Sequence, residues 1–473
     1  CGGQSYGGGG SSGGGGDDGL FAWVIFELLR LLVYLTIEYP AIGIPLDIIV
    51  IAGVLYFLFR RRSSSVGSFT SAVAISHPAN AVEDVEREFD QLRRFDPNFS
   101  EIVFTDFCYA LYAKAHDARG RGSSALDLLS PYISQKAREV LMQLNPAGLS
   151  EVKGIIIGAM NVSNVHGLET PIVRISLLFE TNYTEVVNGK ENAYYVNERW
   201  DLERKRDVLS PPPAKATALH CPRCGGPLQR DSIGACSFCG TKIDSGEFQW
   251  YVRSISLLGK ESRGPLLTSD VPEVGTDLSS VMQPGVMKLR EEFERNNPGF
   301  TWAAFQNRAA LIFNELQAAW STLDWERARP HETDSIFQMH QFWIDAYKRQ
   351  KLRNIVDQST IRAMQPVKIK EDAFYQAITI RIWASGYDYT VDESGKIVSG
   401  SNKKIRQWTE YWTFIRNREA KPGAAHADLN CPNCAAPLKV NATGICEFCG
   451  GKITSGEFDW VLSKIEQDES YRG

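Results

Sequence analysis

The chain has 473 residues, a formal net charge of −5 and ten cysteines. This length predicts several domains, and the acidic balance gives no support to a nucleic-acid partner, because phosphate-binding surfaces are strongly basic. Eight of the ten cysteines fall into Cys-x-x-Cys pairs, which argues against a disulfide framework and favours a reducing compartment.

The first segment, residues 1–19, is a run of glycine and serine that begins at Cys1. This composition predicts a flexible tether. A chain that begins with cysteine is typical of a bacterial lipoprotein after signal-peptide cleavage, so we expect lipidation at Cys1. A processing boundary that falls at this residue for another reason is the alternative.

Two apolar segments follow the tether. Residues 40–62 contain an almost unbroken apolar stretch that ends in three arginines, and its length of about eighteen residues suffices to cross a hydrocarbon core. We therefore predict a transmembrane helix and an arginine stop. Residues 20–39 also carry Glu27 and Arg30, one helical turn apart, so this segment is expected to lie along the interface, to re-enter the membrane or to face a partner helix.

Topology depends on which apolar segments span the membrane. If only residues 40–62 cross, an exported N-terminus leaves the rest of the chain in the cytoplasm, and the arginines lie on the inner side as the positive-inside rule favours. If both segments cross, the rest returns to the exported side. The arginines and the thiols both favour the first arrangement, so we expect a single-pass protein of the bacterial inner membrane with cytoplasmic domains.

The first soluble domain is expected at residues 81–218, after a linker at 63–80. Residues 96–100, Asp-Pro-Asn-Phe-Ser, break one helix and cap the next, and Asn188-Gly189 is a hairpin signal. Cys108 falls in an apolar helical pattern and is expected to be a buried thiol. The periodicity predicts helices around 82–92, 104–115 and 132–144, then strands around 154–158, 172–179 and 194–204.

The second soluble domain, at residues 284–424, follows a linker at 256–283 and repeats this order. Residues 297–301, Asn-Pro-Gly-Phe-Thr, again break and cap a helix, and helices precede strands that turn at Asp392 to Gly395. Helices followed by antiparallel strands predict an α+β fold in which helices pack on one face of a curved sheet.

Each soluble domain is followed by a cysteine repeat, which we name ribbon 1 (residues 219–255) and ribbon 2 (residues 425–468). Two Cys-x-x-Cys turns separated by eleven residues supply four thiolates, the ligand set of a structural Zn²⁺ site. We therefore predict two structural zinc ions and treat a catalytic or nucleic-acid role as the alternative. The last strand of each ribbon is expected in the matching tails 242–250 and 452–460. The predicted ligands are Cys221, Cys224, Cys236, Cys239, Cys431, Cys434, Cys446 and Cys449.

A family resemblance rests on three stretches of the second domain. These are residues 297–300, the helix end at 318–329 with its Ala-Trp and Leu-Asp pairs, and the strand 410–416. They resemble the domain of the mitochondrial import scaffold called translocase of the inner membrane forty-four, and the glycine-rich start and membrane stretch resemble bacterial members. The first domain lacks the Ala-Trp and Leu-Asp pairs and carries Arg119 and Arg121 instead. The resemblance implies a cone-shaped fold, akin to nuclear transport factor two, with a large apolar pocket that binds membranes or partner proteins.

No catalytic triad, phosphate loop or carboxylate pair is recognisable, so we expect no enzymatic activity. His340 with Asp334 or Asp345 is the nearest to an acid–base set, and surface helix positions explain these residues better. Aromatic side chains are candidates for lining an apolar pocket, although packing between helix and sheet explains most of them. The candidate pocket residues are Phe313, Trp320, Trp383 and Trp412.

Two functions follow from these predictions. The first is a membrane-anchored scaffold or accessory subunit that docks proteins of a membrane complex, favoured because duplication places two docking surfaces on one tether. The second is a lipid-binding or apolar-ligand-binding protein at the membrane surface. The expected partners are membrane lipids and other proteins of a membrane complex.

Overall fold

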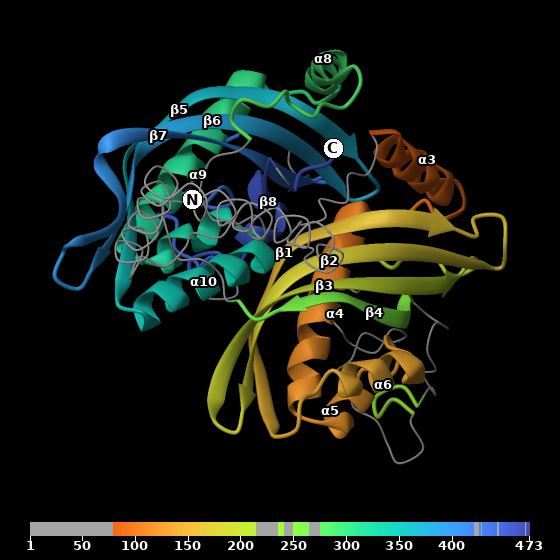
Figure 1. Ribbon diagram of the computed structural model, residues 1–473. Helices are drawn as coiled ribbons and strands as arrows, with labels where there is room; N and C mark the ends of the chain where they lie inside the picture. Colours follow the sequence, from red (N-terminus) through yellow and green to blue (C-terminus); the bar gives the residue numbers. More distant parts are fainter. Residues whose placement is uncertain are drawn as a thin grey trace, which may run out of the picture. The chain divides into compact units, whose positions relative to one another are not determined.

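The computed structural model describes residues 79–213, 235–240, 249–263, 275–420, 425–426, 428–441, 444–468 and 470–473 (Figure 1). The predicted tether, both apolar segments, Cys1, Cys221 and Cys224 lie outside the described residues. In the part of the chain that the structure describes, no helix is both long and apolar enough to cross a membrane.

The first half of the described chain, residues 79–263, places helices before strands, as predicted. Its four strands form one antiparallel sheet in the order β1-β2-β3-β4. The elements are α3 (Ala79–Phe95), α4 (Glu101–Gly120), α5 (Ser123–Asp127), α6 (Gln135–Gln143), β1 (Leu149–His166), β2 (Ile172–Val187), β3 (Lys190–Lys205) and β4 (Tyr251–Glu261).

The second half, residues 275–473, repeats this arrangement with an antiparallel sheet in the order β5-β6-β7-β8. The prediction of helices combined with antiparallel sheets is confirmed for both halves. The elements are α8 (Val286–Asn296), α9 (Trp302–Thr322), the 3-10 helix η1 (Trp325–His331), α10 (Asp334–Arg349), β5 (Leu352–Glu371), β6 (Tyr375–Asp392), β7 (Ile397–Asn417), the 3-10 helix η2 (Ile453–Ser455) and β8 (Val461–Gln467).

Local sequence signals account for the helix starts and the hairpins. Ser100 caps α4 by accepting a hydrogen bond from the backbone N–H of Val103 at 3.2 Å, and Thr301 caps α9 through Ala304 in the same way. Such a cap stabilises a helix by about 1 kcal/mol. Asn188 and Gly189 both have positive φ and join β2 to β3, which confirms the predicted hairpin.

The fourth strand of each sheet comes after the cysteine ribbon. β4 pairs with β3 and β8 pairs with β7, so each ribbon is inserted between the third and fourth strands of a sheet. The expected boundaries of the ribbons therefore overlap the sheets. The expected end of ribbon 1, residue 255, falls inside β4, and the expected range of ribbon 2, residues 425–468, includes all of β8. The expected last strand of ribbon 2, at 452–460, is instead the 3-10 helix η2 and a turn. Gly456, with a left-handed φ of 75°, turns the chain at this point, so the extended strand begins only at Val461.

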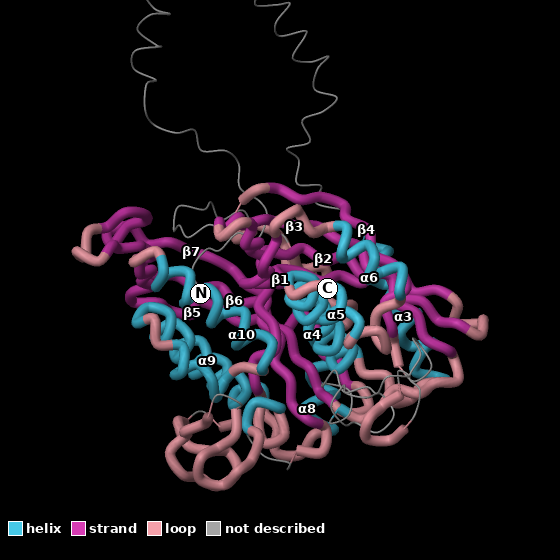
Figure 2. The backbone as a smooth tube through the Cα atoms, turned by 90° about the horizontal axis from the view of Figure 1, so that it is seen from below, coloured by secondary structure: helices cyan, strands magenta, loops and turns pink. Residues whose placement is uncertain are grey.

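Aromatic side chains fill the space between helices and sheet. α4 lies against β1 and α9 lies against β5 (Figure 1, Figure 2). In the second half, Phe305 from α9 meets Phe414 from β7 and Trp460 just before β8, and all three side chains are fully buried. Cys108 is buried in the core of the first half, as predicted.

The described residues from 79 to 473 belong to one compact unit, and the two halves contact each other inside it. Ser100 donates a hydrogen bond to Asp372 Oδ2 at 2.6 Å, and Lys370 forms an ion pair with Glu101 at 2.6 Å. An apolar group, Val103 with Tyr375, Ile415 and Val461, packs beside these pairs. The halves are therefore held together by both charged and apolar contacts.

Candidate functional site

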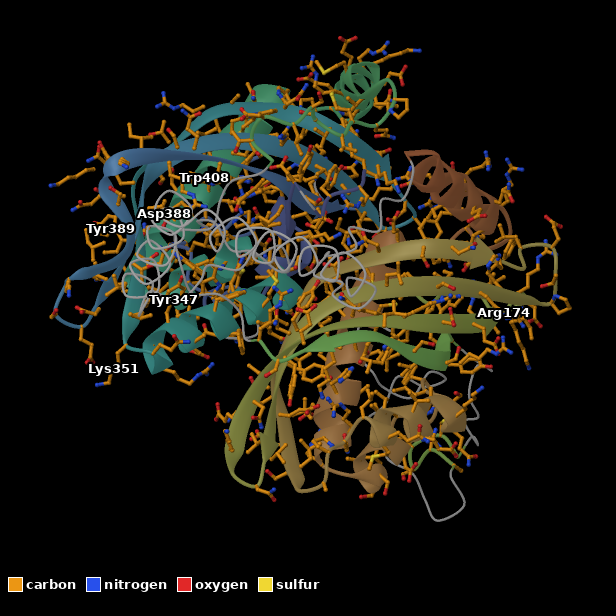
Figure 3. All side chains as sticks on the ribbon, in the orientation of Figure 1. Arg174, Tyr347, Lys351, Asp388, Tyr389 and Trp408 are labelled. Atoms are coloured by element: carbon orange, nitrogen blue, oxygen red, sulfur yellow. The ribbon has the colours of Figure 1, made fainter. Side chains whose placement is uncertain are left out.

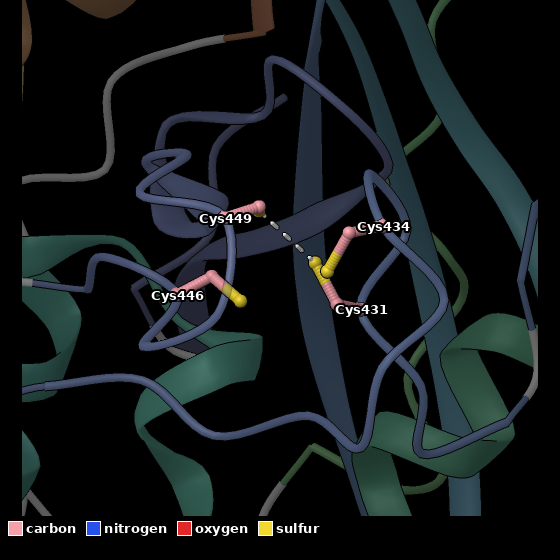
Figure 4. A group of neighbouring side chains, drawn as sticks. All are labelled: Cys431, Cys434, Cys446 and Cys449. Carbon is pink, nitrogen blue, oxygen red and sulfur yellow. Dashed lines mark hydrogen bonds between the residues drawn. The ribbon is translucent and has the colours of Figure 1, made fainter.

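Four cysteines of ribbon 2 converge on one point. The sulfur atoms of Cys431, Cys434, Cys446 and Cys449 all lie within 4.8 Å of one another (Figure 4). Cys431 Sγ and Cys449 Sγ are 3.9 Å apart, close to the separation of about 3.8 Å that a tetrahedral Zn²⁺ with sulfur bonds of about 2.3 Å requires. The four cysteines therefore fit a metal ion that is coordinated by four thiolates.

The two turns that carry these cysteines have matching backbone geometry. Ala435 N–H donates to the carbonyl of Cys431 at 2.8 Å, and Gly450 N–H donates to the carbonyl of Cys446 at 3.0 Å. Ala435 and Gly450 both have positive φ, of 61° and 70°, which lets each turn close around its pair of thiols. Each Cys-x-x-Cys turn thus places its two sulfur atoms on the same side of the four-cysteine group.

The thiols of ribbon 2 differ in their surroundings. The backbone N–H of Gly451 lowers the pKa of Cys449 to about 7, and Asn433 Nδ2 donates to its sulfur at 3.3 Å. Burial raises the pKa of Cys431 to about 12. A bound cation would hold all four as thiolates, because it removes the thiol protons on binding.

Ribbon 2 is fastened to the helices of its own half. Lys452 Nζ lies 2.8 Å from Asp334 Oδ2 at the start of α10, and Arg329 from η1 forms an ion pair with the same carboxylate. Arg308 from α9, 1 % exposed, donates to the carbonyl of Trp460 at 3.2 Å. The four-cysteine group is therefore part of the domain surface and does not form a separate module.

Ribbon 1 is described at its second pair only. Cys236 is buried and Cys239 is exposed, and Gly240 N–H donates to the carbonyl of Cys236 at 2.8 Å with a φ of 68°. This is the turn seen at Cys446 and Gly450. Among the described residues one four-cysteine group is found, in ribbon 2, so a metal ion in ribbon 1 stays a prediction.

The first half contains a buried charged cluster that sequence reasoning did not identify. His116 Nε2 lies 3.1 Å from Glu198 Oε2, and Arg119 lies 2.8 Å from Glu185 Oε1. All four side chains are fully buried. Lys260 Nζ, on β4, reaches both oxygens of Glu185 at 2.9 Å. The positive charges of Arg119 and Lys260 balance the negative charges of Glu185 and Glu198, which allows the cluster to remain inside the fold.

The hydrogen bonds of this cluster fix the protonation of His116. Arg119 Nε–H can only donate, so His116 Nδ1, 3.0 Å away, must accept. The imidazole proton therefore resides on Nε2 and is donated to Glu198. Burial lowers the pKa of His116, which agrees with a neutral ring. Although burial opposes it, the contact with His116 helps hold the pKa of Glu198 below its usual value.

The second half has different side chains at the corresponding positions. When Phe99 is aligned with Phe300, Gln317 replaces His116 and Trp320 replaces Arg119. Trp320 Nε1 donates to Asn354 Oδ1 at 2.7 Å, and Asn354 Nδ2 in turn donates to Asp388 Oδ1 at 2.7 Å. The arginine in place of tryptophan was visible in the sequence, but its carboxylate partners lie on distant strands.

The predicted pocket residues do not line one cavity in the described part of the chain. Phe313, Trp320 and Trp412 are fully buried between α9 and the sheet. Trp383 instead lines a cavity of about 470 Å³, to which Trp408, labelled in Figure 3, also contributes. The lining residues are Thr276, Arg362, Ala363, Gln365, Trp383, Ala384, Gln407 and Trp408.

His340, the best candidate for an acid–base set, pairs with a carboxylate other than the expected ones. Its Nδ1 lies 2.6 Å from Glu332 Oε1, and Trp325 Nε1 donates to the same carboxylate at 3.0 Å. Asp334 binds Lys452, and Asp345 accepts from a neighbouring glutamine on α10. His340 is 4 % exposed and supports the packing of η1 against α10.

The second half is thus a helix-on-sheet α+β domain with a four-cysteine ribbon before its last strand. Residues 287–425 match the model of the Tim44-like domain family and form a Tim44-like domain. The match runs from α8 through β7 and ends at residue 425, where ribbon 2 begins. The first half lies outside the match. A search of the curated proteins returned no match to this chain.

Proposed function

We propose that the protein is a non-enzymatic, membrane-anchored scaffold or accessory subunit that docks proteins of a membrane complex through its two helix-on-sheet halves. The observation that carries the proposal is the Tim44-like domain at residues 287–425, which suggests such a role in membrane-associated complexes. In this proposal the chain is a single-pass protein of the bacterial inner membrane with its halves in the cytoplasm.

The construction of the two halves suits docking. Contacts such as Ser100 with Asp372 join the halves, and ribbon 2 is fastened to α9 and α10. Two docking surfaces on one tether raise the effective concentration of the second contact once the first has formed. Two structural zinc ions, one in each ribbon, would stiffen these surfaces.

Binding of a lipid or another apolar ligand at the membrane surface is the second candidate function. The observation that favours it is the cavity of about 470 Å³ beside Trp383, which lies within the size range of small-molecule sites, about 300–1,000 Å³. In this alternative, a membrane lipid binds in the cavity as a ligand, in addition to the lipids of the membrane that anchors the protein.

Purification of the native protein tests the proposal. The protein is extracted from its membrane in mild detergent, sized by light scattering, and its companions are identified by mass spectrometry. The scaffold function predicts a large particle with protein partners in fixed ratio. A lone protein that carries a defined lipid would refute it in favour of ligand binding.

The membrane topology is tested separately. In intact spheroplasts, cytoplasmic halves are expected to resist a protease that cannot cross the membrane. Digestion of the ribbons under these conditions would refute the cytoplasmic placement.

A further inference from the structure

The cavity beside Trp383 is lined by residues from both faces of the second sheet. Ile378, Ile380 and Ile382 of β6 belong to the core beneath the helices. Side chains alternate along a strand, so Arg381 and Trp383 project from the opposite face. Ala384 and Trp408, which also line the cavity, belong to the core between helices and sheet, so the cavity adjoins that core and extends past Trp383 on the other face.

The segment before α8 builds one wall of the cavity. Arg381 donates to the carbonyl of Gly275 at 2.9 Å and to that of Leu278 at 2.7 Å. Ser280 donates to Gln365 Oε1 at 2.8 Å, which ties the segment to β5. Thr276, between these anchors, is thereby placed at the cavity edge.

The cavity combines apolar surface with unused hydrogen-bonding groups. Trp383 is half-buried, while Trp408 is 2 % exposed. Trp408 Nε1 and Thr276 Oγ1 are buried without a hydrogen-bond partner, and both residues line the cavity. A buried donor without an acceptor is costly, so a ligand that supplies acceptors is favoured over a hydrocarbon chain.

The charged side chains at the cavity are mainly basic, although the exposed Asp277 directly follows Thr276. Its lining includes Arg362 and no carboxylate. Arg362 Nε donates to Ser385 at 2.8 Å, and the side chain is otherwise exposed. Residues 402–405 bulge out of β7 just before Gln407, which places the exposed Lys403 and Lys404 next to the lining in sequence. No ion pair to these three cations is found among the described residues, so the surface complements an anionic partner.

We propose that this cavity and the neighbouring bulge bind a short acidic segment of a partner protein, which inserts one aromatic or aliphatic side chain against Trp383. The carbonyl groups of such a segment can accept hydrogen bonds from Thr276 and Trp408, and its carboxylates meet Arg362 and Lys404. The inference rests on the proposed function, because it names the surface on which the scaffold docks a partner.

Peptide binding to the full-length protein in detergent tests this inference. The probe is a short fluorescein-labelled peptide in which glutamates flank one phenylalanine, followed by fluorescence anisotropy. We expect saturable binding that weakens about tenfold or more in Trp383→Ala and in Arg362→Glu. Lys288→Glu, an equally drastic charge reversal at a side chain that is 81 % exposed on α8, is the matched control and should bind as the wild type does.

Three results would overturn the inference. The first is equal binding of a peptide in which lysines replace the glutamates. The second is unchanged affinity in Arg362→Glu, a surface variant that should fold normally even if Trp383→Ala does not. The third is binding of phosphatidylglycerol vesicles that is lost in Arg362→Glu, combined with no binding of the acidic peptide to the wild-type protein.

The same variant separates this inference from the proposed function. If Arg362→Glu still co-purifies with the membrane complex in full amount, docking occurs elsewhere and only the inference fails. If the wild-type protein carries no partner, the scaffold function itself fails. Loss of the complex in Arg362→Glu but not in Lys288→Glu would support both.

Discussion

Replacing Arg119 with methionine tests whether the buried charged cluster holds the first half together. Arg119 donates to His116 Nδ1 at 3.0 Å, to Asn145 Oδ1 at 2.8 Å and to Glu185 Oε1 at 2.8 Å. Methionine has a similar length and an apolar end, so it fills most of the space while removing every one of these bonds. Glu185 then remains buried with Lys260 as its charged partner.

The magnitude follows from the partners that remain. Removing one member of a buried ion pair costs about 3–5 kcal/mol, because the other charge is left uncompensated. Lys260 contacts both oxygens of Glu185 at 2.9 Å and limits this loss. We therefore expect the lower end, about 3 kcal/mol, which corresponds to a fall of about 6–12 °C in the unfolding temperature for a half of this size.

Scanning calorimetry of the full chain measures the shift, and hydrogen exchange in β2 assigns it to the first half. Arg121→Met is the matched control, because Arg121 and its partner Asp117 are 55 % and 45 % exposed. Arg121→Met should lower the free energy of unfolding by less than about 1 kcal/mol, as is usual for surface ion pairs. The reasoning would be refuted if Arg119→Met lowered the unfolding temperature no more than Arg121→Met does.

Three further predictions concern the metal and two histidines. Cys446→Ser should lower the bound zinc by one ion per chain and unfold ribbon 2, measured by plasma emission spectrometry and proteolysis; an unchanged metal content would contradict the assignment. His116→Gln should fold with a smaller loss than His116→Leu, because Gln317 occupies the matching position; thermal unfolding compares them, and an equal loss would contradict the expectation. The hydrogen bond to Asp459 raises the pKa of His426, so its contribution is full below the ordinary histidine pKa and is lost as pH rises through the raised value. Between about pH 6 and pH 8 the wild type should therefore lose more thermal stability than His426→Ala, and parallel profiles would argue against this.

Several features were predictable because they depend on residues close together in the chain. The caps at Ser100 and Thr301 bond to N–H groups three residues away, and the Asn188-Gly189 turn depends on two adjacent backbone conformations. The two Cys-x-x-Cys turns of ribbon 2 likewise follow from local geometry. Their meeting at one site was predictable because eleven residues leave a second turn within reach of the first.

Other features were not predictable because they join distant strands. Glu185 and Glu198 lie on different strands, 66 and 82 residues from their partners Arg119 and His116. Alternation along the strands places Glu198 on the face of Trp200 and Glu185 on the face of Tyr183, but nothing in the local pattern indicates which cations lie opposite them. A buried carboxylate in a strand is unfavourable until the partner is in place, so the pairing becomes visible only in the folded domain.

The sequence by itself determined that helices precede strands in each half, the repeat, and the four cysteines that come together in ribbon 2, because helical periodicity, capping and cysteine spacing act over a few residues. Only the tertiary structure decided that β4 and β8 close the sheets after the ribbons, and that Trp383 faces away from Trp320 and Trp412. A strand's partner and the face of each side chain depend on the pairing register, and one residue of slippage reverses every face. That register is set by contacts across the whole sheet.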